Sequence, residues 1–235
     1  LALLALCGPA AVHAADALTI ARVLGEDIGS GQLGDATDAD SRARALAGIV
    51  YQRIGAAYVT REGLAATPTE IDDLAAYDAR FRRNDRAQRA RKLDELRAKL
   101  ASSGLSAAER TRTEDFRATL ERLAQQDADD DAQPAPAPAA LRAAYAAQVE
   151  RWKLAAALQR RYGGVVGLSE GGIYPHGALA HLYRDAAAKG ELLILDAELE
   201  QRFWQIVEGP PQRSMPPELA DFTPYWQRPI PSSYY

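Results

Sequence analysis

Two histidines, His176 and His181, are the residues of this chain whose type most readily suggests metal chemistry. Metal-ligating histidines on one helix usually stand three or four residues apart, which places both rings on one face. A spacing of five puts these two about 140° apart around the helix axis. Beyond the first fourteen residues the chain has no other histidine and no cysteine. We therefore expect no metal site, and no motif indicates an organic cofactor.

Ser169, Glu170, His176 and Asp185 are the neighbouring residues whose types could support a hydrolase. Nucleophilic catalysis needs a serine, a histidine base and an acid that orients the base. Ser169 does not stand in a Gly-x-Ser-x-Gly turn, and the glutamate that follows it does not build an oxyanion hole. A hydrolase-type site near Glu170 and His176 therefore stays an alternative. Catalysis is not the function that the sequence favours.

Glycines cluster between residues 163 and 172, which invites comparison with a phosphate-binding loop. Such a loop follows a strand and ends in a Gly-Lys-Ser/Thr sequence that opens a helix. Here a helical pattern precedes Gly163 and Gly164, and no lysine follows them. The pattern instead predicts a helix end and a tight turn.

A run of basic residues is the strongest charge feature of the chain. It could hold an acidic partner, anionic lipid head groups or the aspartates Asp129 to Asp131 of the same chain. The alternative is a solvated helix face whose arginines pair with nearby acids such as Asp94 and Glu95. The chain's net charge of −4 does not suit a nucleic-acid binder, and we expect none to bind. The basic patch consists of Arg80, Arg82, Arg83, Arg86 and Arg89, followed by Arg91 and Lys92.

Aromatic residues recur at helical spacing on two predicted helices. Tyr77 and Phe81 lie on the first, and Tyr145 and Trp152 lie on the second. They are candidates for lining an apolar groove that binds a peptide or a partner, although burial in a core would explain them equally well. The tail, residues 210–235, is rich in prolines and aromatics and too apolar for a disordered segment. It is predicted to pack along the helices of the same chain, or to dock in a partner's groove.

The first fourteen residues read as a signal peptide, with an apolar run followed by the small-residue site Val12-His13-Ala14. Cleavage is expected between Ala14 and Ala15. A lipoprotein interpretation through Cys7 is disfavoured because the residue before it, Leu6, is not small. The leader is too short to cross a bilayer, and no later apolar run is long enough, so we expect no transmembrane segment. These features predict a periplasmic or secreted protein.

Helical patterns with clear start signals dominate the rest of the chain. One helix is expected to be capped by Ser41 or Asp40 and to run to about Arg61, where Gly63 ends it. Thr67-Pro68-Thr69-Glu70 and Ser106 to Glu109 are capping boxes that open two further helices. The helical module of residues 15–126 is then followed by an acidic, proline-rich linker at 127–139, predicted to be extended.

The second half of the chain combines helices with short β-prone runs. A helix is expected from Ala140 to Tyr162. The runs 165–168 and 192–195 flank another helix and are predicted to pair as two strands. Asp196 is expected to cap a final helix, which Gly209-Pro210-Pro211 ends. Residues 140–209 thus form a C-terminal α+β module.

The segment Arg22-Val23-Leu24-Gly25-Glu26-Asp27-Ile28 and the run from Tyr58 to Asp72 resemble the N-terminal domain of SurA-like, parvulin-associated periplasmic chaperones. The resemblance covers about half the chain. It implies binding of peptides or unfolded chains. Many members of that family carry a parvulin isomerase domain, but no segment here has its length and paired histidines, so isomerase activity is not expected.

Together these features predict a mainly α-helical protein, in which a SurA-N-like multi-helix module is joined to a C-terminal helical module with a small two-stranded β element. The expected function is non-catalytic and chaperone-like: binding of extended or unfolded polypeptide, or of an envelope protein. A dedicated scaffold or partner protein of an envelope complex is the alternative. The sequence does not indicate the oligomeric state.

Overall fold

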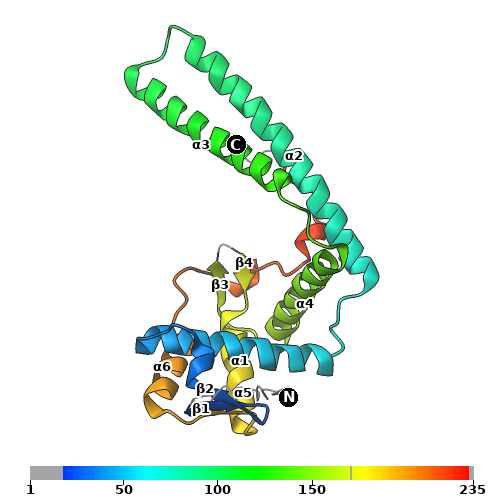
Figure 1. The fold of residues 1–235 in the computed structure, drawn as a ribbon, viewed down its shortest axis with the longest axis vertical. Coiled ribbons are helices and arrows are strands. Elements are labelled where there is room, and N and C mark those ends of the chain that lie inside the picture. The colour runs from blue at the N-terminus through cyan, green and yellow to red at the C-terminus, as the bar shows by residue number, and fades with distance from the viewer. Residues whose placement is uncertain (1–17, 170, 233–235) are drawn as a thin grey trace, which may run out of the picture. The chain divides into compact units, whose positions relative to one another are not determined.

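The computed structural model describes residues 18–169 and 171–232, and it confirms a mainly helical protein with small antiparallel β elements. The chain folds into two compact units (Figure 1). Residues 18–62 and 157–220 form the first unit, and residues 63–156 and 221–232 form the second. The predicted leader, residues 1–14, lies outside the described residues.

The first unit begins with a β-hairpin. Strands β1 (Thr19–Val23) and β2 (Glu26–Gly29) pair antiparallel around a two-residue turn at Leu24 and Gly25. Both turn residues have positive φ, 54° and 81°, the type I′ geometry that matches the twist of the strands. Glycine accepts this conformation freely, whereas Leu24 adopts it at a cost of about 1–2 kcal/mol.

Two three-stranded antiparallel sheets complete the β structure of the first unit. One has the order β2-β1-β5, with β5 at Leu192–Ile194. The other has the order β4-β3-β6, formed by Gly172–Tyr174, Val166–Ser169 and Ser214–Met215. The predicted pairing of runs 165–168 and 192–195 is therefore wrong. A strand–helix–strand crossover would make them parallel, and β3 instead pairs with β4, which follows it closely and closes a much shorter loop.

Helices cover the strands of the first unit. Helix α1 (Ala39–Arg61) buries Leu46, Val50 and Ile54 and packs along α6 (Ala197–Glu208). The predicted N-cap, Ser41 or Asp40, is wrong: the cap is Asp38, whose carboxylate accepts a hydrogen bond from the Ser41 amide. Asp196 caps α6 as predicted, since its carboxylate accepts a hydrogen bond from the Leu199 amide at 3.0 Å. Helix α5 (His176–Ala188) lies between β4 and β5 in the chain.

Three long helices build the second unit. Helix α2 (Pro68–Ala101) and helix α3 (Ala107–Ala132) pack side by side as an antiparallel hairpin (Figure 1). Both predicted capping boxes, Thr67 with Glu70 and Ser106 with Glu109, are present. Leu93, Leu96 and Leu120 form the small core of the hairpin. Helix α4 (Pro138–Tyr162) follows, and its residues up to 156 belong to this unit.

The extended conformation predicted for the linker is wrong for residues 127–132, because helix α3 continues to Ala132. Aspartates near a helix C-terminus are unfavourable beside the negative end of the helix dipole. Asp127 and Asp131, however, pair with arginines of α2, which removes their mutual repulsion. An expectation based on composition alone overlooks this pairing.

Candidate functional site

The second unit gathers the four predicted aromatic residues into one place. On α2, Leu74, Tyr77 and Phe81 follow each other at three- and four-residue spacing, which puts them on one face. On α4, Tyr145, Val149 and Trp152 have the same spacing. These residues meet in a single apolar cluster, called the aromatic cluster below.

The C-terminal segment, residues 221–232, packs against the aromatic cluster formed by α2 and α4. Tyr225 and Trp226 lie in the short 3₁₀ helix η3 (Tyr225–Gln227), and Trp226 is only 5% exposed. The ring of Tyr225 meets those of Tyr77 and Trp152 edge-on, each at 5.5 Å between centroids. Trp226 contacts Trp152 at 6.1 Å, and Ile230 also packs against the cluster. The predicted packing of the tail along its own helices therefore holds for this segment.

Side chains of the two helices bind the backbone of the C-terminal segment. The Trp152 indole donates a hydrogen bond to the Phe222 carbonyl at 2.7 Å. The side-chain amides of Asn84 and Gln88, one turn apart on α2, both donate to the Pro231 carbonyl at 3.3 Å. Pro224 has φ −52° and ψ 125°, close to polyproline II geometry. The segment is thus recognised by its rings and by its carbonyl groups.

One polar group at the aromatic cluster, the indole N–H of Trp226, is buried without a partner among the described residues. The pKa of the Tyr225 phenol is raised, first by burial and then by the nearby carboxylate of Asp78. The pKa of Tyr145 is raised for the same two reasons. Both phenols stay neutral at ordinary pH and can act as hydrogen-bond donors.

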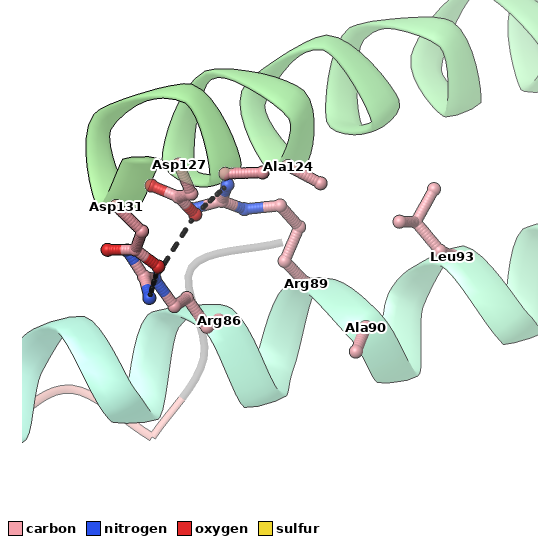
Figure 2. Close-up of a pocket in the computed structure, with 8 residues that line it drawn as sticks. Arg86, Arg89, Ala90, Leu93, Ala124, Asp127 and Asp131 are labelled. Atoms are coloured by element: carbon pink, nitrogen blue, oxygen red, sulfur yellow. Dashed lines mark hydrogen bonds and ion pairs between the residues drawn. The ribbon is translucent and has the colours of Figure 1, made fainter. Parts of the chain in front are cut away.

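The basic patch of α2 does not act as one surface. Arg80 and Arg83 are exposed, and Arg82 pairs with Asp78 at 3.9 Å. Arg86 bonds Asp131 at 2.7 Å, and Arg89, whose side chain is only 8% exposed, bonds Asp127 at 2.7 Å (Figure 2). Arg89 also pairs with Asp85 on its own helix. A hollow of about 280 Å³ lies beside these pairs. Arg86 and Arg89 therefore join α2 to α3. One predicted alternative paired the basic run with the linker aspartates Asp129 to Asp131. The partners are instead Asp127 and Asp131, and both belong to helix α3.

The hydrolase alternative does not find its residues assembled. Glu170 lies outside the described residues. His176 Nε2 donates a hydrogen bond to the Gly209 carbonyl at 2.6 Å, and Ser169 Oγ donates to the Gly172 carbonyl at 3.1 Å. Asp185 accepts a hydrogen bond from the Tyr162 hydroxyl at 2.7 Å. These partners tie each residue to local structure and leave no serine–histidine–acid relay in the part of the chain that is described.

The two histidines do not form a metal site either. His181 is exposed, and its ring stacks on Tyr162 with 6.0 Å between centroids. Within residues 18–169 and 171–232, no group of three or more potential ligands is placed to hold a metal ion.

The glycine-rich segment contains the end of α4 and strand β3, and glycines in it and at the start of α5 stand at close contacts. Gly163 and Gly164 end α4 with positive φ, 63° and 89°. A Cβ on Gly177 would stand 2.8 Å from the Val165 backbone nitrogen, and one on Gly167 would overlap the Tyr174 ring. The glycines thus allow close approach of backbone to backbone and of backbone to ring.

Comparison with protein-family models, characterised proteins and solved structures finds no match to this chain. None of the helices in the described residues is both long and apolar enough to span a membrane.

The sequence pattern indicated the aromatic residues but not the amides that accompany them. Asn84 and Gln88 stand at i and i+4 within the basic run, on the same face of α2. Uncharged amides with this spacing among arginines are a usable signal. The role of these amides is visible only in the fold, where the C-terminal segment lies against that face of α2.

Proposed function

We propose that this protein binds extended polypeptide without catalysing a reaction, as a chaperone-like protein of the periplasm or the cell exterior. The observation that carries the proposal is the binding of residues 221–232 by the aromatic cluster. That segment is itself a proline-rich polypeptide, and it is held by aromatic rings and by donors to its carbonyl groups.

The chemistry of the aromatic cluster suits many sequences. Aromatic rings contribute large apolar contact area, and carbonyl groups are present in every polypeptide. Segments in polyproline II geometry lose little conformational entropy when they bind. The resemblance of residues 18–126 to SurA-like chaperones supports the same function, and the predicted leader supports an exported location.

Suppression of aggregation tests the proposal. The full chain, without ATP, is mixed with chemically denatured citrate synthase, and light scattering is followed on dilution. We expect scattering to fall as the protein is added up to a few-fold molar excess. A protein that leaves the scattering unchanged at that excess does not have this function.

Two phenylalanines of the same unit give a matched pair of variants. Phe81 borders the aromatic cluster, whereas Phe116 stands exposed on α3. Phe81→Ala is expected to weaken the suppression of aggregation, and Phe116→Ala is expected to leave it unchanged. Thermal unfolding of both variants shows whether each remains folded in the assay.

A dedicated envelope partner or scaffold is the second candidate function. The observation that favours it is the exposure of Phe116 (38%) and Leu123 (39%), seven residues apart on one side of α3. Such a stripe is typical of helices that pair with another protein. A scaffold would co-purify with one envelope component and would not suppress aggregation of citrate synthase.

A further inference from the structure

The C-terminal segment is attached to the aromatic cluster by side-chain contacts. It enters the second unit at Asp221, after a proline-containing stretch that leaves the first unit at Ala220. Trp152, Asn84 and Gln88 hold its carbonyl groups, and its own rings fill the space between the helix faces. A segment held in this way can leave without unwinding α2 or α4.

We propose that residues 221–232 are an exchangeable resident ligand, and that the partner that replaces them is a polypeptide of the same pattern. This inference rests on the proposed function. The pattern is an aromatic pair followed, four residues after the second ring, by an aliphatic residue between two prolines. In this chain those positions are Tyr225-Trp226 and Pro229-Ile230-Pro231.

Each part of the pattern corresponds to a contact. The first ring stands edge-on between Tyr77 and Trp152, and the second packs against Trp152. The aliphatic side chain meets the cluster, and the carbonyl of the last proline accepts from Asn84 and Gln88. The spacing of four residues sets the distance between the ring contacts and these amides. A partner needs both ends of the pattern to satisfy them.

The resident ligand is an imperfect one, which favours exchange. Trp226 Nε1 is buried without an acceptor among the described residues. A buried donor without a partner weakens binding by about tenfold. A partner with phenylalanine at this position avoids that loss.

Attachment to the same chain compensates for the imperfect fit. A short flexible connection gives a tethered ligand an effective concentration in the millimolar range. If the empty cluster binds a free peptide with micromolar affinity, competition by the resident segment raises the apparent Kd for an outside peptide by a factor on the order of a thousand. The wild-type protein is therefore expected to bind outside ligands weakly until its own segment is released.

Fluorescence anisotropy with a synthetic peptide tests the exchange. The probe is residues 221–232 with a fluorophore at its N-terminus, and the proteins are full-length chains. The variant Tyr225→Ala/Trp226→Ala weakens the resident segment, and Gln227→Ala, exposed in the same turn, is the matched control. We expect binding to the double variant to be at least about tenfold tighter than to the wild type or the control.

Two further measurements keep the test decisive. A peptide with both aromatics replaced by alanine is expected not to bind. If the double variant has lost its thermal unfolding transition, the wild-type peptide is expected to restore it, because the peptide supplies the missing part of the core. Equal binding to all proteins, no binding to any, or no restoration would overturn the proposal.

The outcomes separate this inference from the proposed function. Peptide exchange without suppression of aggregation would remove the general chaperone function and keep the ligand pattern. Suppression that is equally strong in the wild type and the double variant would keep the function and remove the exchange.

Discussion

Replacing Trp226 by alanine and by phenylalanine separates the two contributions of its indole ring. The ring is 5% exposed and packs against Trp152 and Tyr225, with 6.1 and 5.1 Å between centroids. Its Nε1 is buried without an acceptor among the described residues. The ring therefore stabilises the second unit by burial, while its N–H group opposes that stabilisation.

The two substitutions are expected to differ strongly. Trp226→Ala removes the buried ring and leaves a cavity, which costs about 3–5 kcal/mol in the free energy of unfolding. Trp226→Phe loses about 1 kcal/mol of apolar burial but also removes the unpartnered donor, which recovers about 1–3 kcal/mol. The phenylalanine variant should therefore lie within about 1 kcal/mol of the wild type, or above it.

Urea denaturation measures the difference. The chain has three tryptophans, and Trp204 belongs to the first unit. In a Trp204→Phe background, the fluorescence of Trp152 reports on the second unit in every variant. The urea midpoint is compared at constant slope, since a changed slope would mean that the unfolding reaction itself has changed.

Equal destabilisation of the second unit by Trp226→Phe and by Trp226→Ala would refute the assignment of Trp226 Nε1 as an unpartnered donor. Such a result would mean that the indole N–H makes a hydrogen bond worth more than the burial it accompanies. It would also remove the imperfect fit on which exchange of the C-terminal segment partly depends.

Three further predictions concern the α2–α3 hairpin, the cap of α6 and the glycine at the start of α5. Asp127→Ala leaves Arg89 without one of its carboxylates and should lower the free energy of unfolding, measured with urea, by about 1–2 kcal/mol. Asp130 is exposed, and Asp130→Ala should change that free energy by less than about 0.5 kcal/mol. Asp196→Ala should cost about 1 kcal/mol at neutral pH. The pKa of Asp196 is lowered, chiefly by the hydrogen bond from the Leu199 amide. The contribution of this carboxylate to stability is therefore complete above its unfolded pKa and is lost as pH falls through the lower folded pKa. The stabilities of the wild type and the variant should converge in acid, and a constant difference between them from pH 7 to 2 would contradict this. Gly177→Ala should lower thermal stability by about 1–3 kcal/mol, because its Cβ would meet the Val165 backbone at 2.8 Å. Gly171→Ala, with 3.7 Å to the nearest atom, should be close to neutral. Similar melting of the two variants would show that the start of α5 shifts freely to accept the Cβ.

Local signals in the sequence predicted the helices well. The capping boxes at Thr67 and Ser106 and the cap at Asp196 were correct, because each is a contact between residues three apart in the chain. The pairing of strands was predicted wrongly. Val166 and Leu192 each occupy a strand, but the choice of partner depends on which segments the folded chain brings alongside them.

The candidate site shows the same division. Periodicity identified Tyr77, Phe81, Tyr145 and Trp152 as residues of apolar helix faces, but an apolar stripe looks alike whether it lines a core or a binding surface. The basic run was also visible, yet its pairing with Asp127 and Asp131 depends on α3 returning along α2.

The sequence by itself therefore determined where most helices lie, the caps of α2, α3 and α6, and the apolar character of the faces that form the aromatic cluster. These features depend on residues within one or two turns of each other, where spacing fixes geometry. Only the tertiary structure decided that the C-terminal segment lies against that cluster, with Trp226 buried and Pro231 held by Asn84 and Gln88. Those contacts join residues more than seventy positions apart, and spacing along the chain does not specify which distant surfaces meet.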